Sequence, residues 1–465
     1  MPVQAPLIRS CSPQAPDDVV GEWLDVGAEG ADAAVQRASA AYDGWSSIPA
    51  HERSQALVEA VDRVAAAQEE LAALVTREVG KPRGEALSEV QRTVAILRFY
   101  AQAALDADGE TFPASEARSW LLARRRPRGV VALITPWNFP LAIPAWKLAP
   151  ALAWGNSVVL KPAREGMATA TRLAQLLGLP RGVLEILHSG TAGGGRLASH
   201  PDVRALSFTG STATGRSLAI ATTQAGIPFQ AEMGGSNASI VLDDADLDRA
   251  SRIIAGAAMG FAGQKCTSTS RVVVIGDEAQ ACDAIVAAVE ALRVGDPTAS
   301  DVAVGPVISA QARGRVLEAA ERAVREGGRL LTGGVGEGRG WFIRPIVLRD
   351  VAPGAELSRE EVFGPICVVL PARNDAEAAR IADATPYGLV ASVFTRDLDR
   401  AMTFVDRLHV GMLRVNAPTT GVDFHAPFGG TRASSMGPRE QGRAAREFYT
   451  STVTITISPS GDPRP

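Results

Sequence analysis

Residues 31–105 have the apolar spacing of helices. Ala, Leu and Val recur at helical intervals between charged residues up to residue 80, Gly80–Pro82 interrupts the pattern, and residues 85–105 resume it. An apolar face opposite a charged face is what a helix packed on a protein surface needs. We therefore predict surface-packed helices over this stretch.

The pattern then changes to strands. Residues 109–127 combine turn residues, short apolar runs and the basic cluster Arg124–Arg126, which predicts an exposed strand or arm. From Gly129, the β-branched runs VVALI, NSVVLKP and VLEIL are followed in turn by the helical segments WKLAPALAW, ATRLAQLLG and GRLASH, and a similar alternation resumes after Asp244. This alternation is typical of βαβ units with parallel sheets, so we predict an α/β fold. TSTVTITI near the C-terminus predicts a lone strand that pairs elsewhere.

Charge and cysteine usage narrow the function classes. Lys and Arg total 47 against 51 Asp and Glu, giving a net charge of −4, which disfavours nucleic acid and anionic membranes as partners. No unbroken, uncharged apolar run reaches the roughly 18 residues of a membrane span. The first residues lack the continuous apolar stretch after a basic start that a secretory signal needs, so we expect no export. The four cysteines form no CxxC pair, so we expect neither disulfides nor a metal site, and a cytoplasmic location.

Lysine is scarce enough to mark individual positions. Only four of the 47 basic residues are lysine: Lys81, Lys147, Lys161 and Lys265. A flexible ammonium is not interchangeable with a guanidinium, and the last three lie near other chemically suggestive residues. We therefore treat those three as candidate functional residues. For any one of them, a surface lysine without a specific role is an equally good explanation.

Three further segments could carry chemistry. The glycine-rich turns HSGTAGGG (188–195) and FTGSTATG (208–215) follow strand-like runs and precede helices, where backbone N–H groups can approach a phosphate, although each alone could equally bind nothing. Cys266 lies in the polar sequence FAGQKCTSTSR beside Lys265, a cation that would lower a thiol pKa and so favour a nucleophile. Cys282 and Cys367 fall in apolar runs and are predicted to lie in the core.

These segments belong to an ordered series of motifs. The series is ITPWNFP (134–140), WKLAPALAWGNSVVLKPA (146–163), FTGSTATG, EMGG (232–235), GQKCT (263–267), EEVFGP (360–365) and PFGGTRASSMGPREQG (427–442). In order and spacing it resembles the NAD(P)-dependent aldehyde dehydrogenase superfamily over nearly the whole chain. AIPAWK, FQAEMGG, NAPTTGVDFHAPFGG and GPREQGRAAREFYT are most similar to bacterial semialdehyde dehydrogenases, especially those acting on 2-oxoglutarate semialdehyde.

The resemblance implies a catalytic set. Cys266 is implied as the nucleophile that forms a thiohemiacetal, and Asn138, with the cysteine N–H, as the oxyanion hole. Glu232 is implied as the general base that activates water for thioester hydrolysis. Lys147 matches a lysine beside the active site, and Glu440 matches a second acid of a proton relay.

The resemblance also implies an NAD or NADP site. Lys161 would contact the adenosine ribose, Gly210 and Ser211 the pyrophosphate side, and Glu361 the nicotinamide ribose, with Phe363 near the ring. The remaining implied cofactor positions are Thr135, Pro136, Trp137, Gly190, Gly194, Phe208, Gly215 and Gly234.

Departures from the family pattern affect cofactor and substrate. Many members have Glu at the position of Arg164, and a Glu there would repel the 2′-phosphate of NADP, whereas Arg can bind it. NADP is therefore expected to be tolerated or preferred. The alternative is that Arg164 points to solvent and Glu165 contacts the ribose of NAD instead. Ser236 and Arg432 replace usual lysines and are expected to be structural. Trp146 stands where succinate-semialdehyde enzymes place an Arg for the substrate carboxylate, so an apolar or aromatic aldehyde competes with an acidic semialdehyde. The implied substrate pocket comprises Phe139, Ile143, Trp146, Lys265, Thr267, Phe424 and Phe428.

The implied organisation is a Rossmann-like cofactor-binding domain (1–108 and 128–234), an α/β catalytic domain (235–449), an oligomerisation element (109–127 and 450–459) and a tail (460–465). We expect a homo-oligomer, dimer or tetramer, that acts on a small-molecule aldehyde. A CoA-acylating enzyme is disfavoured by Glu232, and a non-catalytic relative by the intact Cys266, Asn138 and Glu361. A phosphoryl-transfer enzyme is disfavoured because no GxxxxGK[ST] loop occurs.

Overall fold

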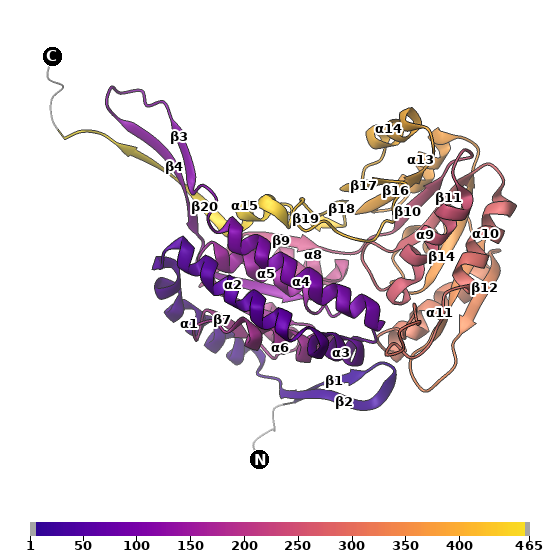
Figure 1. Ribbon diagram of the computed structural model, residues 1–465, viewed down its shortest axis with the longest axis horizontal. Helices are drawn as coiled ribbons and strands as arrows, with labels where there is room; N and C mark the ends of the chain where they lie inside the picture. The colour runs from indigo at the N-terminus through magenta and orange to yellow at the C-terminus, as the bar shows by residue number, and fades with distance from the viewer. Residues whose placement is uncertain (1–5, 461–465) are drawn as a thin grey trace.

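The computed structural model describes residues 6–460, which fold around two large β-sheets in separate halves of the molecule, with an arm projecting from one half (Figure 1). The predicted α/β class is confirmed. The predicted tail at 460–465 lies, beyond residue 460, outside the described residues. None of the helices in the described part is long and apolar enough to cross a bilayer.

The N-terminal region is a β-hairpin followed by a helical layer. The hairpin was not predicted, because polar residues and Pro16 interrupt its apolar alternation. Gly80, at φ +70°, ends the third helix in a left-handed conformation that glycine adopts without strain, as the Gly80–Pro82 stop predicted. The elements are β1 (Leu7–Ser12), β2 (Ala15–Leu24), α1 (Gly27–Ser47), α2 (Ala50–Ala66), α3 (Gln68–Val79) and α4 (Arg83–Ala103).

The first large sheet has six strands, all parallel except β19. Every residue of β5 is buried, as expected for an apolar strand covered on both faces. In spatial order the strands are β19 (Ser435–Met436), β9 (Phe229–Glu232), β8 (Val203–Thr209), β5 (Val130–Thr135), β6 (Ser157–Pro162) and β7 (Leu184–Ile186); the helices are α5 (Ala142–Ala153), α6 (Met167–Leu177), α7 (Thr191–Leu197) and α8 (Thr212–Ala225). Because β5, β8 and β9 are parallel, the motifs at their carboxyl ends meet at one edge of the sheet.

The second large sheet has seven strands, of which only β12 runs antiparallel to its neighbour. In spatial order they are β12 (Arg329–Val335), β13 (Ile343–Arg349), β14 (Ile366–Ala372), β11 (Thr269–Ile275), β10 (Asn237–Val241), β16 (Val390–Phe394) and β17 (Met412–Val415). Its helices are α9 (Leu247–Met259), α10 (Glu278–Glu290), α11 (Ala310–Arg325), α12 (Glu356–Arg359), α13 (Asp375–Asp383) and α14 (Leu398–Arg407). Cys282 and Cys367 are buried in this core, as predicted.

The arm is a three-stranded sheet of β3 (Gly109–Phe112), β4 (Trp120–Pro127) and β20 (Thr450–Ile457). β20 follows α15 (Ala445–Tyr449) and pairs with β4 over its whole length, so the predicted lone C-terminal strand finds its partner in the arm. The remaining pair, β15 (Tyr387–Gly388) with β18 (Thr431–Arg432), joins two loops. The division into domains stays a prediction.

Candidate active site

A cavity of about 360 Å³ lies where the carboxyl edge of the first sheet meets loops of the second half. Its wall combines segments that follow β5, β8 and β9 with the loop before β11 and the loop after α12. Ten of the predicted site residues line it: Pro136, Trp137, Asn138, Ile143, Gly210, Ser211, Gly234, Cys266, Glu361 and Phe363. The structure therefore brings the predicted nucleophile, the oxyanion-hole amide and the nicotinamide-side residues to one space.

The loop that carries Cys266 begins with a strained turn. In the turn η2 (Gly260–Gly263), Phe261 and Ala262 have φ of +51° and +52°, a left-handed conformation that costs energy for residues with a Cβ. Both are buried. Gln264 fixes the next residues, because its Oε1 accepts a hydrogen bond from Ile308 N (2.8 Å) and its Nε2 donates to Pro306 O (3.3 Å). The thiol thus projects from a loop held on several sides.

Asn138 lies directly against this loop. Its Nδ2 donates to Gln264 O at 2.9 Å, and the side chain is buried. A primary amide has two N–H groups, so one remains for an oxyanion at Cys266. This geometry supports the predicted oxyanion hole.

The electrostatics of Cys266 differ from expectation. Lys265 does not face the thiol, because its Nζ pairs with Glu85 Oε2 at 2.7 Å. Burial, with the charges of Glu361 and Glu232, raises the pKa of the Cys266 thiol above its usual value. The expectation that the neighbouring lysine lowers this pKa is wrong, because the Lys265 ammonium forms its ion pair with Glu85 instead.

Glu232, at the end of β9, is a buried carboxylate with one free oxygen. Its Oε2 accepts a hydrogen bond from Ser435 Oγ at 2.5 Å, whereas Oε1 has no partner among residues 6–460. Burial first, and the charge of Glu440 second, raise the pKa of Glu232 well above the usual range. Gly429, at φ +146°, lies so close that a Cβ there would come within 2.6 Å of Glu232 Oε1, which explains a glycine in PFGG.

A buried ion pair lies behind this carboxylate. Lys147 Nζ, from α5, bonds Glu440 Oε1 and donates to Ser207 Oγ at 2.7 Å; its side chain is fully buried. Glu440 Oε2 has no partner in the described part of the chain. Lys147, Ser207 and Glu440 are thus joined by hydrogen bonds, whereas Glu440 acts on Glu232 through its charge. The proton relay stays a prediction.

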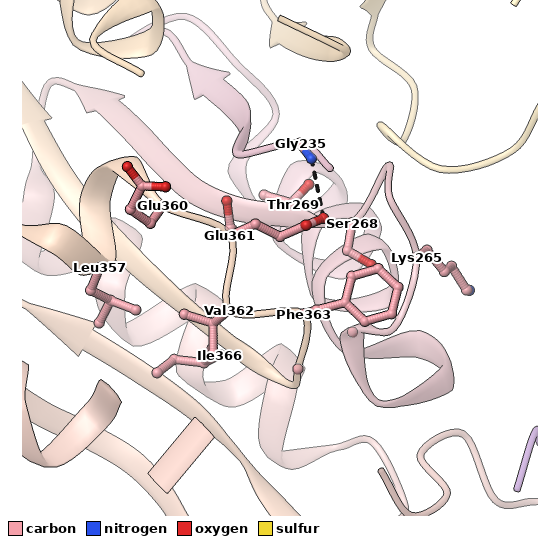
Figure 2. A pocket seen from close by; sticks show the side chains of 13 residues that line it. Gly235, Lys265, Ser268, Thr269, Leu357, Glu360, Glu361, Val362, Phe363 and Ile366 are labelled. Carbon is pink, nitrogen blue, oxygen red and sulfur yellow. Dashed lines mark hydrogen bonds between the residues drawn. The ribbon is translucent and has the colours of Figure 1, made fainter. Parts of the chain in front are cut away.

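The nicotinamide side is organised around Glu361. Figure 2 shows the Glu361 carboxylate directed at Gly235, whose N–H donates to Oε1 at 3.1 Å, with Lys265 pointing away. Burial raises the pKa of Glu361 to about 7. On the opposite wall, Gly210 and Ser211 precede α8, and Ser211 Oγ caps the helix by accepting from Thr214 N at 3.3 Å. A helix N-terminus facing a cavity is suited to a phosphate.

The predicted adenosine-side residues lie outside the wall of this cavity. Gly194 packs against the mostly buried Lys161 side chain, and the N–H of Gly190 donates to Asp25 Oδ2 at 3.2 Å. Arg164 pairs with the adjacent Glu165 at 2.8 Å, and its side chain is 63% exposed. Predicted positions that are buried and absent from the cavity wall are Thr135, Phe208 and Gly215.

The predicted substrate residues divide into two groups. Trp146 and Phe428 pack together with ring centroids 5.7 Å apart, and Phe424 packs on Phe99 of α4 at 5.9 Å. Phe139 instead lies beneath a lysine ammonium, 3.8 Å from its ring centroid, and Thr267 is buried. Of the seven predicted substrate residues, Ile143 alone lines the cavity, so a substrate pocket formed by the others stays a prediction.

Sequence reasoning missed several residues at or behind the site, among them Thr209, Met233 and Val362 of the cavity wall. Arg315 of α11 lines the cavity, and Ser435 bonds Glu232, although nothing in the sequence marks either among its neighbours. The lysine over Phe139 is Lys81, which is fully buried and paired with Glu89. Lysine scarcity was the signal that could have found Lys81, but it lies outside the recognised motifs. Arg432 bonds Asp383 O at 3.0 Å, in agreement with a structural role.

The sequence as a whole matches one family model, that of the aldehyde dehydrogenase family, over residues 3–455. The chain belongs to the aldehyde dehydrogenase family. It is 37% identical over 463 residues to alpha-ketoglutaric semialdehyde dehydrogenase of Bacillus subtilis (strain 168), covering 97% of this chain and 95% of the relative. It is 40% identical over 455 residues to alpha-ketoglutarate semialdehyde dehydrogenase of Haloferax volcanii, covering 96% and 94%.

The fold agrees with the sequence comparison. The crystal structure of an NAD-dependent aldehyde dehydrogenase from Sinorhizobium meliloti superimposes with a TM-score of 0.95 and 32% identity, covering 100% of this chain and 94% of that one. The predicted aldehyde dehydrogenase fold and NAD(P)-dependent oxidation of an aldehyde to a carboxylic acid are therefore confirmed.

Proposed function

We propose that this aldehyde dehydrogenase oxidises a carboxylated semialdehyde of the 2-oxoglutarate-semialdehyde type to the dicarboxylic acid. The observation that carries the proposal is the single cavity lined by Cys266, Asn138 and Glu361, in a chain similar over nearly its whole length to relatives with that name. The residue roles below are part of the proposal.

Cys266 attacks the aldehyde carbon and forms a thiohemiacetal. Burial, and then the charges of Glu361 and Glu232, raise the pKa of the Cys266 thiol, and the positive charge that oxidised nicotinamide carries would oppose this effect when bound nearby. The free N–H of Asn138 and the Cys266 N–H then stabilise the oxyanion, a contribution of about 3 kcal/mol per donor in comparable sites.

The cofactor-facing residues fit a dinucleotide. The N-terminus of α8 offers backbone N–H groups to a pyrophosphate, and the absence of a Cβ at Gly234 leaves room for the Glu361 carboxylate to reach the cavity. Bound NAD or NADP supplies the acceptor for the hydride that leaves the thiohemiacetal. Glu361 would hold the ribose, and Phe363 and Trp137, with ring centroids 5.7 Å apart, would flank the nicotinamide.

Glu232 activates the water that hydrolyses the thioester. Its free Oε1 can accept the water proton once the carboxylate is ionised, and Ser435 holds the other oxygen. Glu440, whose charge acts on Glu232, and its partner Lys147 are the next proton-carrying groups in this proposal. Glu232 as the water-activating base also favours hydrolysis over transfer to CoA.

The substrate class can be tested against its competitor. The Trp146–Phe428 pair, and Phe424 packed on Phe99, favour an apolar or aromatic aldehyde as the second candidate. Reduced-nicotinamide absorbance should be followed with 2-oxoglutarate semialdehyde, succinate semialdehyde, hexanal and benzaldehyde. We expect the largest kcat/KM with 2-oxoglutarate semialdehyde, and a preference for benzaldehyde would overturn the proposal.

Cofactor preference and assembly complete the proposal. NADP is accepted alongside NAD because Arg164, rather than Glu, occupies the solvent edge near Lys161.

The arm assembles the protein into a homo-oligomer, since Phe112, Trp120 and Ile457 are exposed on its strands. Size-exclusion chromatography with light scattering would contradict this assembly if it gave a monomer. Its nucleophilic thiol suits a reducing compartment such as the cytoplasm.

A further inference from the structure

A fully buried lysine outside the recognised motifs contacts Asn138 and the strained turn that precedes Cys266. Lys81, between α3 and α4, has no exposed surface, and its Nζ donates to Asn138 O at 2.7 Å. The same ammonium lies 4.6 Å from the ring centroid of Phe261 in the strained turn before Cys266. One cation therefore touches the residue that carries the amide and the turn that presents the thiol.

The partner of this lysine fixes the segment that follows Asn138. Glu89 of α4 pairs with Lys81, and its Oε1 accepts hydrogen bonds from Leu141 N (2.9 Å) and Ala142 N (3.1 Å). Those two residues begin α5, which carries Lys147. The pair therefore restrains the main chain from residue 138 to residue 142 at both ends.

Burying two charges is costly and is not needed for packing, because apolar residues of similar volume stabilise a core at least as well. A structural explanation alone does not account for an ammonium placed on Asn138 O and on Phe261. We propose that Lys81, paired with Glu89, is a positioning residue that holds the Asn138 amide and the Cys266 loop in register for attack on the aldehyde. This inference rests on the proposed roles of Asn138 and Cys266.

The test removes both charges together, so that neither is left alone in the core. In K81M/E89Q, both replacements keep nearly the original shape. The first-turnover burst of reduced nicotinamide should slow by about tenfold or more, since misplacement of a reacting group by 1 Å costs about 100-fold. The Kd for NAD, from fluorescence titration, should stay within about twofold, because the proposed cofactor contacts are untouched. An unchanged burst rate in folded protein would overturn the inference.

Coupling to Asn138 separates positioning from general damage. If Lys81 acts through that amide, adding K81M/E89Q to Asn138→Ala should slow the burst by less than about threefold. Two losses that multiply in full would overturn the part of the inference that concerns Asn138. If Asn138→Ala itself leaves the burst unchanged, the proposed oxyanion hole fails; if only K81M/E89Q is silent, this inference alone fails.

The chain offers a matched control for burial. Glu78 is equally buried, three residues before Lys81, and its carboxylate accepts hydrogen bonds from Ala168 N and Thr169 N (both 2.8 Å) at the start of α6. Glu78→Gln should lower the melting temperature without slowing the burst, and an equal slowing would overturn the inference. If K81M/E89Q does not fold, Glu89→Gln alone can be used, because it keeps Lys81 and one side-chain oxygen that can accept hydrogen bonds. This variant should slow the burst. A wild-type burst rate in Glu89→Gln would overturn the inference.

Discussion

The two ends of the proposed cofactor and substrate site differ in how far their ion pairs are exposed to solvent. At the chemical end, Lys147 and Glu440 form an ion pair whose side chains are 0% and 3% exposed. At the adenosine end, Arg164 pairs with its neighbour Glu165 but is 63% exposed. A buried pair is expensive to break, whereas an exposed pair contributes little. The fold therefore fixes the chemistry and leaves nucleotide preference open to change, and substitutions at the two ends should differ accordingly.

Replacing the nucleophile should have the largest effect. Cys266→Ala leaves the cavity wall otherwise intact but removes the atom that bonds the substrate, so kcat should fall by a factor on the order of 10⁴ or more. Titration of protein fluorescence should still show cofactor binding. Retained turnover with native circular dichroism would refute the assignment of Cys266.

Replacing the general base should separate the two half-reactions. Glu232→Gln keeps a side chain able to bond Ser435 but cannot take a proton, so steady-state turnover should fall by roughly 100-fold or more. The first turnover should stay fast, because it precedes water attack. Stopped-flow absorbance should show one reduced nicotinamide per active site, followed by a slow phase. A slow first turnover with no burst would contradict this division of labour.

Neutralising the second acid should shift a pH profile. The negative charge of Glu440 raises the pKa of Glu232, and the positive charge of Lys147 lowers it. Glu440→Gln removes the first influence and keeps the second, so Glu232 should ionise at lower pH. The rising acidic limb of kcat should move downward by roughly one pH unit. A limb that stays in place or moves upward would show that Glu440 does not act on Glu232.

The same contrast explains what the sequence could and could not predict. Cys266, Asn138 and Glu361 were predicted for one site and line one cavity, because each lies in a short motif at the end of a predicted element. The partner of Lys265 was not predictable, since Glu85 is 180 positions away and no local pattern joins them. The burial of Lys81 was missed for a similar reason: it depends on α4, α5 and the Cys266 loop meeting in three dimensions.

Substitutions at the adenosine end should have the smallest effect on activity. They should also show whether Arg164 or Glu165 contacts the ribose of the cofactor. Arg164→Glu should lower the NADP to NAD ratio of kcat/KM by roughly tenfold if the guanidinium bonds the 2′-phosphate, since charge-assisted hydrogen bonds contribute about 1.5–3 kcal/mol and exposure reduces that. Glu165→Gln is the matched change on its partner. It should raise the same ratio slightly by freeing Arg164, whereas a selective loss of NAD turnover would identify Glu165 as the ribose contact. If neither variant changes the ratio, this exposed pair does not select the nucleotide, and the preference must come from the buried surroundings of Lys161.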